Sequence, residues 1–125
     1  MINPTEKDLI SANRKDTHID LAKSEISRPS VAHPLDLITL PHNALPEMNF
    51  DEIDTSCKFL GKRLSFPFMI TGMTGGTERG DKLNIAFAQA ASQSGVALGL
   101  GSQRTSIANG KSQKKIRQLA PNIPL

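Results

Sequence analysis

The residues best suited to chemistry lie in two polar loops that are rich in glycine. Residues 71–77 contain three glycines and three threonines, and residues 99–104 end in a serine, a glutamine and an arginine. Glycine lets a ligand approach the backbone closely and adopts positive φ without strain. The hydroxyl, amide and guanidinium groups add donors that suit a flat polar heterocycle beside an anion. We therefore expect both loops to contact one ligand.

Neither loop matches a standard nucleotide-binding motif. The first lacks the Gly-Lys-Ser/Thr end of a Walker phosphate loop, and the second has Arg104 where a Rossmann fingerprint needs its third glycine. Two simpler readings stay open beside the ligand hypothesis. The glycines could serve only tight turns, and Arg104 could form a surface ion pair.

A third candidate cluster, Arg14, Lys15 and His18, lies near the N-terminus. On a helix these three side chains share one side. The fork of an arginine and the point charge of a lysine together suit a phosphate or diphosphate. A solvated basic turn is the alternative that the spacing leaves open.

The elements that must position the loops are strands and helices in alternation. Residues 66–70 form an almost continuous apolar run, typical of a strand buried on both faces, and residues 96–100 form a second strand. Between them, residues 78–94 carry apolar side chains at helical spacing. Thr77 is placed to cap the start of this helix and Gly95 its end.

The same alternation continues to the end of the chain. Residues 106–120 are predicted as a basic helix that Pro121 ends, and residues 123–125 as the opening of a third strand. Strands that alternate with helices predict an α/β protein with a parallel sheet. Ligands of such sheets bind at the carboxyl ends of the strands, where both polar loops lie.

Residues 1–65 are predicted to form an extension before this α/β part. Short helices are expected near the N-terminus and over residues 19–26. Residues 50–65 read as a β-hairpin, in which residues 53–59 and 63–66 flank a turn at Gly61 and Lys62.

Composition limits the classes of function. The chain has 125 residues, a formal net charge of +3, five Phe and no Trp or Tyr. This mild charge fits an anionic ligand, and the scarcity of aromatic residues disfavours nucleic-acid binding. Cys57, the only cysteine, excludes an internal disulfide, and with His33 and His42 it shows no zinc-type spacing. We find no signal-peptide pattern or apolar run of membrane length, so we expect a cytoplasmic protein without a membrane partner.

Six short motifs, taken together, resemble the type II isopentenyl-diphosphate isomerases. They are Arg14-Lys15-x-x-His18-Ile19 and residues 43–47, 53–56, 59–62, 73–77 and 99–104. Each motif is weak alone, but their order and spacing are specific. The resemblance covers the chain from about residue 13 to its end.

The resemblance implies a (β/α)₈ TIM barrel, of which this chain holds the N-terminal part. Residues 1–65 would be an extension with short helices and a hairpin, and residues 66–125 the first two βα units and the start of the third strand. The implied cofactors are FMN in reduced form, NADPH and Mg²⁺, and full-length members are homo-oligomers. The implied activity is the flavin-assisted interconversion of isopentenyl and dimethylallyl diphosphate in isoprenoid biosynthesis.

The resemblance also implies two groups of site residues. Those matching substrate contacts are Arg14, Lys15, His18, Ser102, Gln103 and Arg104. Those matching flavin contacts are Thr71, Gly72, Met73, Thr74 and Ser102. We assign no catalytic residue and no metal ligand within this chain.

The family is much longer than this chain. We therefore expect the Mg²⁺ ligand and the flavin-phosphate loops to lie outside it, and the 125-residue chain to be inactive alone. Two other readings stay open: a different flavin barrel related to 2-hydroxy-acid oxidases, and a non-catalytic fragment or basic binding module.

Overall fold

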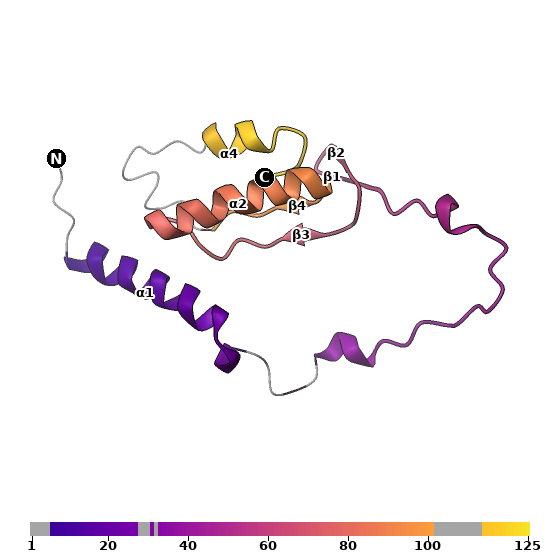
Figure 1. Cartoon of the computed structure of the whole chain (residues 1–125), viewed down its shortest axis with the longest axis horizontal. Coiled ribbons are helices and arrows are strands. Elements are labelled where there is room, and N and C mark those ends of the chain that lie inside the picture. The colour runs from indigo at the N-terminus through magenta and orange to yellow at the C-terminus, as the bar shows by residue number, and fades with distance from the viewer. Residues whose placement is uncertain (1–5, 28–30, 32, 102–113) are drawn as a thin grey trace.

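The computed structural model describes residues 6–27, 31, 33–101 and 114–125 (Figure 1). Its helices are α1 (Glu6–Lys23), α2 (Glu78–Ser94) and α4 (Lys114–Leu119), with short 3-10 turns at Glu25–Ser27, Pro34–Leu37 and Phe50–Glu52. Its strands are β1 (Cys57–Phe59), β2 (Lys62–Leu64), β3 (Met69–Ile70) and β4 (Ala97–Leu98). They form two small sheets, an antiparallel β1–β2 pair and a parallel β3–β4 pair.

The β3–α2–β4 unit is the centre of the fold. Met69 pairs with Ala97 and Ile70 with Leu98, so the two strands run parallel and need a crossover helix. That helix is α2, which contacts β4 and α4 (Figure 1). The buried core consists of Leu64, Ala88, Ala91, Ala97, Leu98, Ile116, Ala120 and Ile123. The two core residues that α2 contributes, Ala88 and Ala91, are small and let the helix pack closely on the strands.

The predicted bounds of α2 are confirmed. Thr77 has extended backbone angles, and its side chain accepts a hydrogen bond from the Gly80 N–H at 3.0 Å. Gly95 ends the helix with φ of 66° in the left-handed region. The cap residues fix both ends because each satisfies backbone groups that the helix leaves unpaired.

The predicted hairpin is also confirmed, with shorter strands and a different turn. Cys57 pairs with Leu64 and Phe59 with Lys62. The turn residues are Leu60 and Gly61, with φ of 47° and 77°. Two successive positive φ values match the right-handed twist of a two-residue hairpin.

The barrel prediction is wrong for the part of the chain that the structure describes. That part holds two two-stranded sheets and no barrel. Strands predicted over residues 66–70 and 96–100 are only two residues long. Phe68 and Met69 are 67% and 50% exposed, contrary to a strand buried on both faces. A parallel strand needs covering layers on both faces, and the described residues do not cover these side chains.

The ends of the chain also differ from expectation. Residues 123–125 form no strand, although the Leu98 N–H donates to the Pro124 carbonyl at 3.1 Å. Pro124 has no N–H with which to extend a ladder. Helix α1 is one continuous 18-residue helix where two shorter ones were predicted. Residues 106–113 of the predicted last helix lie outside the described residues, and the division at residue 65 stays a prediction.

We expect Gly95→Ala to destabilise the protein more than Gly61→Ala. Both glycines have positive φ, so alanine costs about 1–2 kcal/mol at either position. A Cβ at Gly61 meets nothing within 4 Å, whereas one at Gly95 runs into the Ser65 side chain. It would disturb the 2.7 Å hydrogen bond from the Ser65 N–H to the Gly95 carbonyl, adding about 1 kcal/mol. Urea unfolding of both variants measures the difference, and equal losses would contradict this account.

Candidate functional site

A cavity of about 470 Å³ lies where α1, the 71–77 loop and α2 meet. Its lining residues are Lys15, His18, Ile19, Ala22, Lys23, Ile70, Thr71, Met73, Thr74, Leu83 and Phe87. This volume falls in the range of small-molecule sites.

The chemistry of the cavity wall is divided between basic and apolar groups. Helix α1 contributes Lys15, His18 and Lys23, and no carboxylate belongs to the lining among the described residues. Leu83 and Phe87, one turn apart on α2, and Ile70 at the end of β3 supply apolar surface. The cavity therefore suits a molecule with an anionic group and an apolar body.

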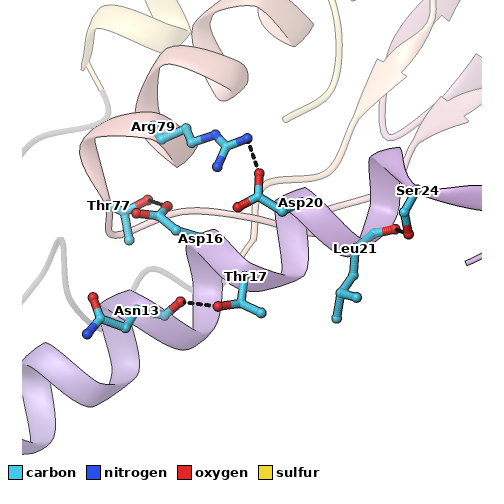
Figure 2. Close-up of polar contacts among 8 residues, drawn as sticks. All are labelled: Asn13, Asp16, Thr17, Asp20, Leu21, Ser24, Thr77 and Arg79. Carbon is cyan, nitrogen blue, oxygen red and sulfur yellow. Dashed lines mark hydrogen bonds and ion pairs between the residues drawn. The ribbon is translucent and has the colours of Figure 1, made fainter. Parts of the chain in front are cut away.

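Polar contacts join α1 to the loop and to the first turn of α2. Lys15 Nζ donates to the Gly75 carbonyl at 2.6 Å. Figure 2 shows the next two contacts along α1: Thr77 Oγ1 with Asp16 Oδ1 at 3.0 Å, and Arg79 with Asp20 Oδ1 at 2.6 Å. These contacts hold α1 against the 71–77 loop and the first turn of α2, so that α1 forms one wall of the cavity.

The two predicted loops meet through their backbones. A Cβ on Gly72 would run into the Leu100 carbonyl, and one on Gly101 into the backbone of Thr74. A Cβ on Gly99 would lie 3.0 Å from the Gly72 nitrogen. These glycines therefore allow the two loops to pack closely. The sequence had suggested instead that they allow a ligand to approach the backbone.

Thr74 is held between the cavity and α2. Asn84, a buried residue of α2, donates to the Thr74 carbonyl at 3.2 Å. Thr74 Oγ1 is buried without a hydrogen-bond partner among the described residues. A Cβ on Gly80 would lie 2.6 Å from this oxygen, so the hydroxyl faces the first turn of α2.

The structure brings together five of the predicted site residues: Lys15, His18, Thr71, Met73 and Thr74 line the one cavity. The other predicted residues are placed differently. Arg14 is exposed and does not line the cavity, and Gly72 faces the second loop. Ser102, Gln103 and Arg104 lie outside the described residues. The binding roles of all these residues stay predictions.

Sequence reasoning missed Lys23, Leu83 and Phe87 as cavity residues. Lys23 follows Lys15 by two helical turns, so the helical period was a signal that could have found it. Leu83 and Phe87 were predicted only as part of the apolar stripe of their helix. Their exposure to the cavity depends on where α1 docks, which local sequence does not encode.

Charge at the α1–α2 contact stabilises the ionised form of Asp20. The hydrogen bond from Arg79 is the main cause that lowers the pKa of Asp20 below its ordinary 3.8; desolvation opposes it, and the charges of Arg79 and Lys23 add to it. The same contact raises the pKa of Arg79. Both groups are therefore charged at neutral pH.

No cluster of three or more His, Cys, Asp or Glu side chains in the part of the chain that the structure describes could hold a metal ion. None of the helices in that part of the chain has the length and apolar character needed to cross a bilayer.

Three relatives of the chain share one name. The chain is 42% identical over 124 residues to isopentenyl-diphosphate delta-isomerase of Rickettsia prowazekii, covering 98% of this chain and 36% of the relative. It is 42% identical to the Metallosphaera sedula protein of the same name (90% and 32% covered) and 41% identical to that of Vibrio parahaemolyticus (90% and 34%). No protein-family model matches the chain. The chain spans about a third of the length of the curated relatives it matches.

We expect Arg79→Gln to raise the pKa of Asp20 toward 3.8, because the main stabilising hydrogen bond is lost. A carboxyl whose pKa is depressed by folding stabilises the fold above its unfolded pKa. The contribution of Asp20 to the free energy of unfolding should therefore be complete above pH 3.8. It should be lost as the pH falls through the lowered pKa that Asp20 has in the folded protein. Carbon NMR titration of the Asp20 carboxyl measures both values. Lys82→Gln, which removes a cation paired with Glu78 on the same helix, should leave the Asp20 pKa unchanged.

Proposed function

We propose that the cavity beside α1 is the diphosphate-substrate site of an isopentenyl-diphosphate delta-isomerase. The observation that carries the proposal is the joint placement of Lys15 and His18 on a cavity that is otherwise mostly apolar. The names of the relatives, at about 40% identity across nearly the whole chain, support the same substrate class.

The basic residues would bind and neutralise the diphosphate. Lys15 is half-buried, and its ammonium group already donates to a backbone carbonyl at the cavity edge. A diphosphate oxygen is a stronger acceptor than a neutral carbonyl because the hydrogen bond is then charge-assisted on both sides. His18 lies one turn further along the same wall, and a ring N–H of its imidazole would add a hydrogen-bond donor.

The apolar residues would hold the five-carbon part of the substrate. Apolar lining residues would shield the alkene from water; they are Ile19, Ile70, Leu83 and Phe87. Both isomers carry the same diphosphate, so binding of that group alone cannot favour the transition state. The rate enhancement must therefore arise at the alkene end of the cavity.

The finer proposal is that this isomerase is of the flavin-dependent, type II class. Thr71, Met73 and Thr74 line the cavity on the side of the 71–77 loop. These residues fit the edge of a flat heterocycle such as the flavin of FMN. When bound, reduced FMN would supply the group that exchanges a proton with the substrate. The chain's own residues would orient the substrate, neutralise its charge and exclude water.

The described residues support no placement of the other two cofactors. No acidic cluster that would hold Mg²⁺ occurs among them, and no step is assigned to that ion. NADPH enters the proposal only as the reductant of the flavin, as the resemblance implies.

We expect Lys15→Met to raise the Kd for isopentenyl diphosphate about tenfold, because methionine keeps the apolar stem but removes the charge. Isothermal titration calorimetry of the 125-residue chain measures the effect. Lys82→Met, on the outer face of α2 with a 75% exposed side chain, is the matched control and should leave the Kd unchanged. Equal losses in both variants would show only a general charge effect and would contradict the site.

We expect the chain alone to bind isopentenyl diphosphate without converting it, because it spans only about a third of the relatives. Assays with reduced FMN and Mg²⁺, and without flavin, test this expectation by following dimethylallyl diphosphate. Turnover without flavin would contradict the type II class. Turnover with flavin would contradict the claim that the chain alone is inactive.

A further inference from the structure

In the middle of helix α1, Lys15 and His18 line the cavity, and Asp16 and Asp20 lie beside it. Lys15, His18, Ile19, Ala22 and Lys23 line the cavity. Asp16 and Asp20 do not, and they lie one turn apart on the neighbouring side of the helix. Successive residues are about 100° apart around a helix. A rotation of α1 by that amount would therefore bring Asp16 to the place of Lys15.

Both acidic residues are held by the start of α2. Asp16 accepts a hydrogen bond from Thr77 at 3.0 Å, and Asp20 pairs with Arg79 at 2.6 Å (Figure 2). Thr77 is also the N-cap of α2, since its oxygen accepts from the Gly80 N–H. The first contact thus couples α1 to the residue that sets where α2 begins.

Few apolar contacts hold α1 in place. Ile19 is 9% exposed, and it is the only buried hydrophobic residue of α1 among those whose burial is described. Ile10 and Leu21 are largely exposed. One buried side chain does not prevent rotation about it, whereas the Asp16 and Asp20 contacts, about 6 Å apart along the axis, do. The hydrogen bond from Lys15 to the Gly75 carbonyl adds a third polar contact.

We propose that Asp16 and Asp20 are positioning residues, which clasp α1 to the start of α2 and thereby direct Lys15, His18 and Lys23 into the cavity. The identity of the anion rests on the proposed function; the clasp itself does not. Because the two carboxylates are turned toward Thr77 and Arg79, they are kept away from the anion. A wrongly rotated α1 would set a carboxylate against a diphosphate, and the like charges would repel.

The same arrangement gives Lys23 a role. Lys23 lines the cavity about 12 Å along the helix axis from Lys15, as the rise per residue requires. The clasped orientation presents both cations to the cavity at once. The wall therefore carries positive charge at both ends of an apolar stretch formed by Ile19 and Ala22.

The test uses two single variants, Asp20→Asn and Arg79→Gln. It also uses one double variant, which carries both Asp20→Arg and Arg79→Asp and so exchanges the pair. Two quantities are measured on the full 125-residue chain: amide hydrogen exchange of residues 10–23 without ligand, and the Kd for isopentenyl diphosphate. We expect each single variant to speed exchange in α1 and to raise the Kd roughly two- to fivefold. The exchanged pair should restore most of both, because it rebuilds the ion pair with the charges reversed. Asp16→Asn should act in the same direction as Asp20→Asn.

Lys82→Gln is the matched control, because it removes a cation from α2 three residues after Arg79 and breaks only the local 2.8 Å pair with Glu78. It should change neither quantity. Unchanged exchange in the single variants would overturn the clasp, and faster exchange with an unchanged Kd would overturn its positioning role. If the unaltered chain binds no isopentenyl diphosphate, the proposed function fails, and the exchange data then decide the clasp alone.

Discussion

The close approach of two loops without intervening side chains is the constraint on which the site depends. Gly72 lies against the Leu100 carbonyl, and Gly101 against the backbone of Thr74. These contacts bring the ends of β3 and β4 together, and they place Thr71, Met73 and Thr74 on one wall of the cavity. A carbonyl in the backbone cannot move aside as a flexible side chain can. The glycines therefore determine the shape of the cavity by packing, and the neighbouring side chains form its lining.

The elements that the sequence predicts well are those whose signals are local. The helix Glu78–Ser94 has its cap residue, its apolar stripe and its terminal glycine within one stretch of chain, and its bounds agree with the structure. The hairpin agrees for the same reason, although its turn falls at Leu60 and Gly61 because positive φ is needed at both. Such signals act before any tertiary contact forms.

The features that the sequence does not predict are those that need distant partners. An apolar run at residues 66–70 indicates a strand buried on both faces only if other layers cover it, and the described residues leave Phe68 and Met69 exposed. The cavity has the same character. Lys15 and His18 could be grouped from helical spacing, but the contacts from Asp16 and Asp20 to Thr77 and Arg79 span 61 and 59 residues. No local pattern encodes that distance.

The weak apolar attachment of α1 is consistent with its place as one wall of the cavity. Apolar burial stabilises in proportion to the area removed from water and does not by itself fix the rotation of a helix about its axis. Two short polar contacts behave differently, since they are directional and weaken steeply when their geometry changes. Polar contacts one helical turn apart can therefore fix the orientation of α1 about its axis, which one buried isoleucine does not.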